Sequence, residues 1–525
     1  MNALPPDRPP RGRSTYGVRL LGVGLIGLAA AAWFLRFEAC AHYFTGRRAG
    51  YRDLFRSGLQ VRDLWMRILI QGAHVGYAHS SMDVDETDPA RTYRLTTILE
   101  MDFAMMGTRR QIASRLEAEL DSLYRLQRFH FRLHSEGYAT EFIGRRQRGD
   151  QFDVEILTPS GSSLTTITIP DDVILESPLL DQALADLKPG QSRVFRILDP
   201  ASLGVSDLRV SALREETITI GETPYRATLL EAVVHGMTIQ SWVDAEGRLL
   251  RQETPMGWTM ELADAETAVA YRKRGRLAPP PDLTLSVSIP ITFPLPNPRA
   301  IQQLTIRLTG LDEWNPSELE TDRQQVVRVE ETGLVLRIVA SGPPSPSEAE
   351  GTTGTDRVAR DDLASTPFIQ SDHPTIRKQA QTILRGMAEN DSWANARAIN
   401  QWVFDHLKKK PTPSLPSAAD VLARREGDCN EHAYLTTALL RAAGLPARVV
   451  AGLVALDNAF AYHAWVAVRI RSRWVEMDPT FGQPIADATH LALTHGELAE
   501  QAKIARYLGR LQISIMDALE GDLSP

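Results

Sequence analysis

Short strand-like segments recur through the first half of the chain, and they limit its fold more than any other feature. Between about Leu64 and Ala270 the segments are short and rich in β-branched or aromatic residues, which is typical of strands. Examples are 93–103 (YRLTTILEMDF), 151–157 (QFDVEIL), 225–234 (YRATLLEAVV) and 258–263 (WTMELA). We therefore expect a large antiparallel sheet that acts as a scaffold or binds a partner.

Other segments interrupt or join these strands. One helix is expected, with Ser177 as N-cap, Pro178 at its first position and an end near Gly190. Residues 277–298 hold seven prolines and predict an extended connector. The tract 301–340 predicts a small β unit, and 341–362 is poor in apolar residues, as flexible linkers are.

Composition excludes several classes of protein. The 525 residues suggest about three or four folding units, and 43% hydrophobic with 23% charged residues is ordinary for globular proteins. The net charge of −7 argues against a nucleic-acid partner. Two cysteines, Cys40 and Cys429, are too few for a disulfide scaffold, a Cys₄ zinc site or an iron–sulfur cluster. Without an acidic cluster typical of a calcium loop, we expect no metal, and no cofactor is implied.

An apolar run near the N-terminus predicts a membrane anchor. Residues 20–35 (LLGVGLIGLAAAAWFL) carry no charge and lie between Arg19 and Arg36. As a helix they would span ~24 Å, and snorkelling arginines would help to cover a ~30 Å hydrocarbon core. The arginine-rich segment before them keeps the N-terminus in the cytoplasm. We expect a single-pass protein of the inner membrane whose C-terminal domains are periplasmic.

Three alternatives to an uncleaved anchor stay open. Ala39, Cys40 and Ala41 have the small-x-small form of a signal-peptide cleavage site. Cys40 could instead carry a lipid, although Glu38 and Phe37 fit poorly before an acylated cysteine. A buried core helix is the remaining alternative.

Beyond Phe368 the pattern becomes helical. Ile376, Ala380, Ile383 and other apolar residues of 374–388 recur at helical spacing. The stretch 394–408 also places its apolar residues, Trp402 among them, on one face, and a further helix is expected from Ala418 to Arg424.

Cys429 has the setting of a reactive thiol. Asp428 can cap a helix that begins at Cys429, and Glu431 completes a capping box. The helix is expected to run to about Ala443. A helix N-terminus favours thiolate over thiol, and its free N–H groups suit an oxyanion. The alternative is a small, buried, apolar cysteine.

His463 and Asp478 are predicted to meet across a hairpin. Alternation over 462–470 indicates one strand and 474–478 the next. If Arg471 and Ser472 form the turn, His463 and Asp478 share a face one diagonal step apart, within hydrogen-bonding reach. A slip of one residue would place them on opposite faces. Taken singly, either residue could be purely structural.

This order of residues resembles the transglutaminase-like superfamily over roughly residues 365–515. The matching motifs are Gly427-Asp428-Cys429, 441–450 (RAAGLPARVV), Gly452, Tyr462-His463-Ala464-Trp465 and 474–480 (WVEMDPT). The resemblance implies a papain-like fold with Cys429 as nucleophile, His463 as general base and Asp478 orienting the imidazole. The oxyanion would be bound at Cys429, with Trp402 as a further candidate, although Trp402 could equally be a core residue.

The expected protein is therefore an α+β chain with a transmembrane helix, a large antiparallel β domain and a papain-like, transglutaminase-like α+β domain. We predict a thiol enzyme that hydrolyses or transamidates protein or peptide amides through a thioacyl-enzyme, with hydrolysis favoured because water is always available. The alternatives are a non-catalytic module that binds cell-envelope proteins or peptides, and an acyltransferase acting on a small amine. The expected divisions are a cytoplasmic tail (1–16), a signal anchor (17–37), a β domain (38–276), a connector (277–300), a β unit (301–340), a linker (341–364) and the transglutaminase-like domain (365–516).

Overall fold

The computed structural model shows a chain that is mostly β. It describes residues 63–521 except 85–91, 106, 136–137, 176–186, 235, 256, 275–279, 283–287, 312–313, 343–360, 412–414, 416, 457 and 508. Strands hold 53% of the described residues and helices 18%. The predicted α+β class is therefore wrong, because long strands run through both halves of the chain and only four described helices exceed five residues.

Some predicted segments lie outside the described residues. These are the tail 1–16, the anchor 17–37, Cys40, most of the helix expected to begin at Ser177, and most of the linker 341–364. None of the helices that the structure describes combines the length and apolar character that a membrane crossing requires. The anchor and the periplasmic location stay predictions from sequence.

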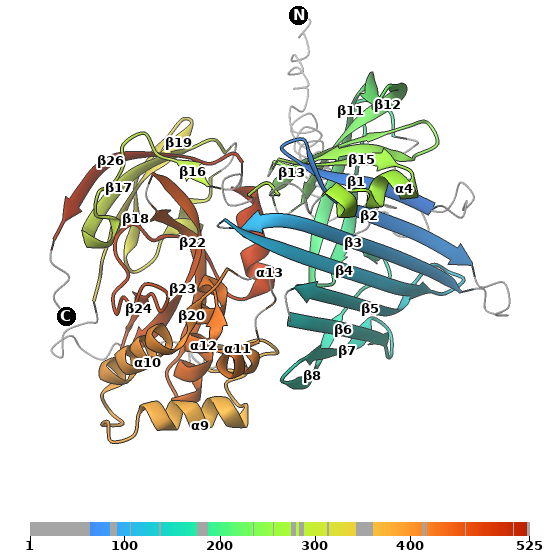
Figure 1. The fold of residues 1–525 in the computed structure, drawn as a ribbon. Helices are drawn as coiled ribbons and strands as arrows, with labels where there is room; N and C mark the ends of the chain where they lie inside the picture. The colour runs from blue at the N-terminus through green and yellow to red at the C-terminus, as the bar shows by residue number, and fades with distance from the viewer. Residues whose placement is uncertain are drawn as a thin grey trace, which may run out of the picture.

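One large sheet contains the first 15 strands (Figure 1). Its order is β8-β7-β6-β5-β4-β3-β2-β1-β15-β14-β13-β12-β11-β10-β9, antiparallel throughout except between β9 and β10. Two runs of consecutive hairpins thus meet where β1 pairs with β15. The strands are β1 (Asp63–Ile70), β2 (Ala73–Val84), β3 (Tyr93–Met105), β4 (Thr108–Leu120), β5 (Leu126–Ser135), β6 (Tyr138–Arg146), β7 (Gln151–Thr158), β8 (Gly161–Thr168), β9 (Val173–Leu175), β10 (Ser192–Asp199), β11 (Gly204–Ile220), β12 (Thr223–Val234), β13 (Met237–Val243), β14 (Leu249–Glu253) and β15 (Trp258–Ala263).

Two short helices, α4 (Ala265–Val269) and α5 (Tyr271–Arg274), follow the large sheet and pack on β2. The next segment was expected to be an extended connector. Part of it, β16 (Ile289–Pro290), instead pairs with β23 of a second sheet.

The second sheet supports the helical part of the chain. It has the order β16-β23-β22-β25, with β24 paired to β23. Its other strands are β22 (Ala447–Leu456), β23 (Ala459–Ile470), β24 (Arg473–Met477) and β25 (Leu491–His495). The helices around it are α9 (Pro374–Ile383), α10 (Ser392–His406), α11 (Ala418–Arg424), α12 (Cys429–Ala442) and α13 (Leu498–Gln501), and a small pair of strands, β20 (Lys408–Lys409) and β21 (Glu426–Gly427), precedes α12.

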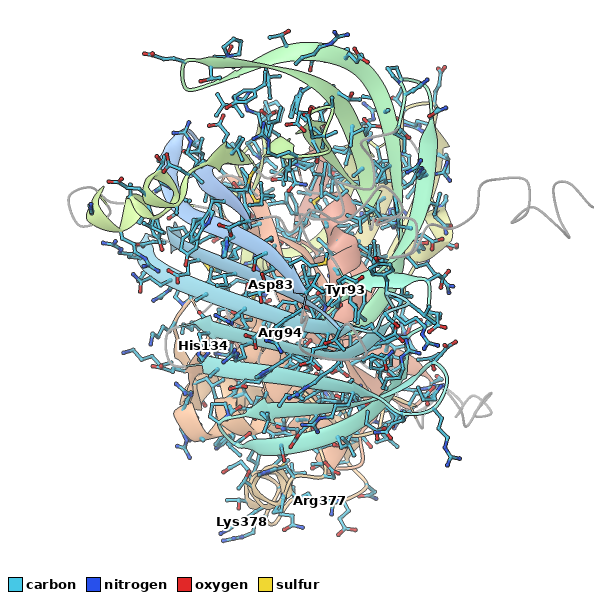
Figure 2. All side chains as sticks on the ribbon, turned by 90° about the vertical axis from the view of Figure 1, so that its right-hand side faces the viewer. Asp83, Tyr93, Arg94, His134, Arg377 and Lys378 are labelled. Carbon is cyan, nitrogen blue, oxygen red and sulfur yellow. The ribbon has the colours of Figure 1, made fainter. Side chains whose placement is uncertain are left out.

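α12 is the central helix of this part. It packs on β22 and β23, and it also contacts α9, α10 and α11. Its residues from Glu431 to Leu440 are all buried. Figure 2 looks onto the large sheet, with exposed Arg377 and Lys378 of α9 at the lower end of the molecule.

A third sheet joins the small β unit to the end of the described chain. Its order is β18-β19-β17-β26. β17 (Ile301–Thr309), β18 (Gln324–Glu330) and β19 (Gly333–Val339) come from the predicted unit, whereas β26 (Gln512–Glu520) begins 173 residues after the end of β19. Three short elements, η3 (Pro298–Ala300), α7 (Pro316–Leu319) and η4 (Ala502–Arg506), complete the described fold.

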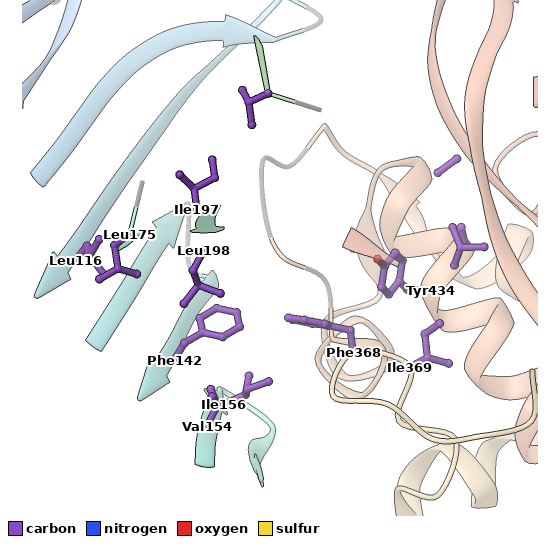
Figure 3. Packing of buried hydrophobic residues seen from close by; sticks show 14 of the residues in the cluster. Leu116, Phe142, Val154, Ile156, Leu175, Ile197, Leu198, Phe368, Ile369 and Tyr434 are labelled. Atoms are coloured by element: carbon purple, nitrogen blue, oxygen red, sulfur yellow. The ribbon is translucent and has the colours of Figure 1, made fainter. Parts of the chain in front are cut away.

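The large sheet and the helical part share one hydrophobic core. Phe142 of β6 faces Phe368, with ring centroids 6.2 Å apart, and Figure 3 shows both side chains between sheet and helices. Buried Tyr434 of α12 belongs to the same cluster. The hydroxyl of Tyr138 donates to the backbone oxygen of Glu426 at 3.1 Å. The large sheet is thereby bonded to the strand that leads into Cys429.

Candidate active site

Cys429 is the first residue of α12, as expected. The capping box is present: the Asp428 side chain accepts from the N–H of Asn430, and Glu431 accepts from the N–H of Asp428 at 2.8 Å. The predicted helix start is therefore confirmed. The Cys429 side chain is partly exposed.

Strand β23 holds this end of α12. The hydroxyl of Tyr462 donates to Asn430 Oδ1 at 3.0 Å, and the backbone N–H of Ala464 hydrogen-bonds the Cys429 sulfur. His463 lies between these two residues in the chain. The two residues that flank His463 in β23 therefore both hydrogen-bond the start of α12. These bonds tie the strand that carries His463 to the helix that carries Cys429.

The turn between β23 and β24 has the predicted length. Ile470 pairs with Arg473, so Arg471 and Ser472 form a two-residue turn, and this register is confirmed. His463 Nε2 lies 2.8 Å from Asp478 Oδ2, and both side chains are buried. Since Nε2 donates to the carboxylate, the neutral imidazole keeps its lone pair on Nδ1.

Gly452, another residue of the predicted motif, lies where only a glycine fits. It pairs with His463 across β22 and β23. A Cβ at this position would lie 2.0 Å from the backbone oxygen of Leu491 in β25. Any side chain would therefore push β25 away from β22, the strand that pairs with β23 at His463.

Four donors surround the Asp478 carboxylate. Oδ1 accepts from the backbone N–H groups of Thr480 at 2.6 Å and Phe481 at 3.1 Å. Oδ2 faces His463 and also His490 Nε2 at 3.0 Å. Burial acts to raise the pKa of Asp478, but the charge and hydrogen bonds of the two histidines outweigh it and hold the pKa well below its usual value.

The pKa of the Cys429 thiol differs from what the sequence predicted. We expected the helix N-terminus to favour a thiolate, but the pKa of Cys429 is raised well above its usual value. Desolvation of the sulfur is the largest cause, and the negative charge of Asp428 adds to it. The N–H of Ala464 acts in the opposite direction without compensating. The resting thiol is therefore neutral and needs a base.

Sequence reasoning found no partner for His490, which lies in the loop before β25. In the structure it is fully buried beside Asp478, and Asp487 lies on its other side. The Asp487–His490 spacing in the sequence was the available signal, but the contact with Asp478 depends on the folded loop. His463, Asp478 and His490 bring three potential ligand atoms within 4.8 Å of one another. The hydrogen bonds at 2.8 and 3.0 Å account for this spacing without a metal ion.

Trp402, the further oxyanion candidate, lies near the end of α10. Its ring stacks on His406 at 4.5 Å between centroids and lies below the guanidinium of Arg425. It also packs against the main hydrophobic core. These contacts involve none of the three predicted catalytic residues.

Comparison with known protein families agrees with this arrangement. Residues 378–479 match the transglutaminase-like superfamily. The matched part runs from α9 to just beyond Asp478 and includes Cys429 and His463. His490 and the large sheet lie outside it. No curated protein matches the chain.

Three solved structures are similar. A proposed cysteine protease from Cytophaga hutchinsonii is 19% identical, with a TM-score of 0.28, covering 43% of this chain and 90% of its own. A β-barrel-like protein of unknown function from Brucella abortus is 9% identical, with a TM-score of 0.28, covering 39% and 98%. A proposed protease from Parabacteroides distasonis is 12% identical, with a TM-score of 0.19, covering 74% and 69%. At these values the similarities carry no argument about activity.

Proposed function

We propose that this protein is a thiol enzyme that acts on amide bonds of proteins or peptides. The observation that carries the proposal is the buried hydrogen bond from His463 to Asp478, in a strand whose next residue, Ala464, hydrogen-bonds the sulfur of Cys429 through its backbone N–H. A carboxylate-oriented imidazole next to a thiol is the arrangement that nucleophilic cysteine catalysis requires.

The proposed first step is proton transfer from Cys429 to His463 Nδ1. A base is needed because the resting thiol is neutral. The thiolate then attacks the amide carbonyl carbon, and the backbone N–H of Cys429 at the start of α12 receives the oxyanion. His463 passes its proton to the leaving amine as the C–N bond breaks, which leaves a thioacyl-enzyme. Asp478 stabilises the imidazolium throughout.

Hydrolysis and transamidation differ only in the second step. With His463 as base, water attacks the thioester and releases an acid, or an amine attacks and forms a new amide. Both routes regenerate the thiol. We favour hydrolysis, since it needs no acceptor site.

The test is the rate at which iodoacetamide alkylates Cys429, measured against pH. Full-length protein with Cys40→Ala leaves Cys429 as the single thiol. Because the resting thiol is neutral, its labelling at pH 7 depends on proton transfer to His463, so His463→Ala should slow labelling about 100-fold. His406→Ala, an exposed histidine on α10, is the matched control. Equal labelling of the parent and the His463 variant would contradict the proposal. If labelling is fast, peptide amides and glutamine donors are screened next.

One observation favours a second candidate, a non-catalytic binding module. The raised pKa of Cys429 is also what an unreactive buried cysteine would have. This candidate predicts slow alkylation of Cys429, with the pH dependence of an ordinary thiol, in both the parent and His463→Ala.

A further inference from the structure

His490 is held by oxygen atoms at both ring nitrogens. Nε2 lies 3.0 Å from Asp478 Oδ2, and Nδ1 lies 3.2 Å from the backbone oxygen of Asp487 and 3.4 Å from its Oδ1. Carboxylate and carbonyl oxygens only accept hydrogen bonds at neutral pH. A neutral imidazole has one N–H and can satisfy one of these sides. Both sides are satisfied only when His490 is an imidazolium.

The surrounding charges favour this cation. The side chains of His490, Asp478 and Asp487 are fully buried. Asp487 also pairs with Arg299 at 3.0 Å. Arg299 precedes β17 and lies outside the matched residues 378–479. A chain of alternating charge therefore leads from Asp478 through His490 and Asp487 to Arg299, and His463 hydrogen-bonds Asp478 at its first end.

Further side chains surround His490 and its two carboxylate partners. Trp465 of β23 packs edge-on against His490 with centroids 5.1 Å apart, and its Nε1 donates to Glu476 of β24. Buried Arg323 pairs with Glu476 and donates to the backbone oxygens of Ala486 and Asp487. The titratable groups that face His490 are the two acidic side chains of Asp478 and Asp487 and the imidazole of His463, whose ring centroid lies 5.6 Å away. Burial acts to lower the pKa of His490, yet the charge of Asp487 and the hydrogen bonds of both carboxylates leave that pKa raised.

We propose that His490 is a positioning residue, a fixed cation that holds the Asp478 carboxylate toward His463 and limits its pull on the His463 proton. The proposal rests on the proposed function and adds a fourth residue to it. Without His490, Asp478 would present a full negative charge to the site. The charge of Asp478 is one of the causes that raise the pKa of Cys429, so a cation that offsets this charge favours the thiolate over the thiol.

The first test is His490→Gln in full-length protein with Cys40→Ala. The Gln side chain can still donate to Asp478 but carries no charge. Loss of a buried cation should move the pH midpoint of Cys429 alkylation upward by about one unit, which is about tenfold slower labelling below the midpoint. His495→Gln on β25 is the matched control, since the environment of His495 lowers its pKa to about 3 and it carries no charge at neutral pH.

Asp487→Asn should remove the positive charge of His490 only as pH rises. It leaves the imidazole in place but removes one of the two carboxylates that keep it charged. Labelling should be close to that of the parent at low pH, and it should approach that of His490→Gln as pH rises. Loss by a constant factor at all pH values, in either variant, would indicate a merely structural role and overturn the proposal.

A measurement on the unsubstituted chain covers the case in which His490→Gln does not fold. Nitrogen-15 histidine NMR against pH should show one imidazolium that keeps both ring N–H groups above the ordinary imidazole pKa of about 6.5, and Asp487→Asn should move its loss to lower pH. If none of the 12 histidines stays doubly protonated beyond the ordinary range, the proposal fails.

The outcomes also separate this proposal from the proposed function. Equal labelling of the parent and His463→Ala would end both. A large loss in His463→Ala without a midpoint shift in His490→Gln would end only the role of His490.

Discussion

The large sheet and the helical part each bury a carboxylate between two basic side chains. In the sheet, Glu261 of β15 accepts from Arg67 of β1 at 2.6 Å and from Arg251 of β14 at 2.5 Å. In the helical part, Asp478 accepts from His463 and His490. The two sites share the same arrangement of two donors around one carboxylate, but they differ in whether a donor can exchange a proton near neutral pH.

The difference is the acidity of the donors. A guanidinium stays protonated at every physiological pH, so the Arg67–Glu261–Arg251 cluster can only fasten three neighbouring strands. An imidazole gains or loses its proton near neutral pH, so one of the two histidines beside Asp478 can act as a base. The first site therefore has a structural role, and the second site has the groups that the proposed catalysis needs.

The largest expected effect comes from separating the two parts. Phe368→Ala removes the side chain that faces Phe142 in the shared core, and it should lower the free energy of unfolding by about 4 kcal/mol. Chemical denaturation measures this value. The control is Leu164→Ala on the edge strand β8, where the side chain is 71% exposed and the change should be within about 0.5 kcal/mol. Similar small losses for both variants would show that the parts are not held by a common core.

Glu261→Gln should disturb stability without disturbing chemistry. It leaves two arginines without a counterion, which should cost about 3 kcal/mol of unfolding free energy. The alkylation rate of Cys429 should not change. The control pair Arg226 and Glu215 is exposed, and Glu215→Gln should cost less than about 1 kcal/mol. A slower alkylation in folded Glu261→Gln would break the contrast between the two sites.

Asp478→Asn should slow the alkylation of Cys429 while the protein stays folded. The amide neither carries the charge that stabilises imidazolium nor imposes the same tautomer. Alkylation of Cys429 at pH 7 should fall about tenfold in protein that is folded by circular dichroism. An unchanged rate would make Asp478 as structural as Glu261.

The smallest effect is a pH dependence of stability. The pKa values of Asp478 and Asp487 are lowered in the folded state, so their contribution is present above pH ~4 and is lost as pH falls through the folded values. The pKa of His490 is raised, so its contribution is full below pH ~6.5 and is lost as pH rises through its folded value. Denaturation against pH should give greatest stability between about 4 and 6.5 from this network. Asp487→Asn should flatten the acid side, and an identical acid slope in the variant would contradict this assignment.

Local patterns in the sequence predicted local structure well. The Asp428 capping box, the α12 start and the two-residue turn at 471–472 all depend on residues a few positions apart. The class of the whole chain was mistaken, because long strands run through both halves of the chain. Two of its strands, β16 and β26, pair with strands far away in sequence. Neither strand has a partner that its own neighbourhood would reveal.

The sequence by itself determined where the proposed catalytic side chains lie on their own elements, because the helix cap and strand alternation set the positions of Cys429, His463 and Asp478. Only the tertiary structure decided their electrostatic state. Desolvation keeps the thiol neutral, and a loop beyond the matched core places His490 and Asp487 against Asp478. Burial and charge are properties of what surrounds a residue, and those surroundings exist only after distant segments have packed together.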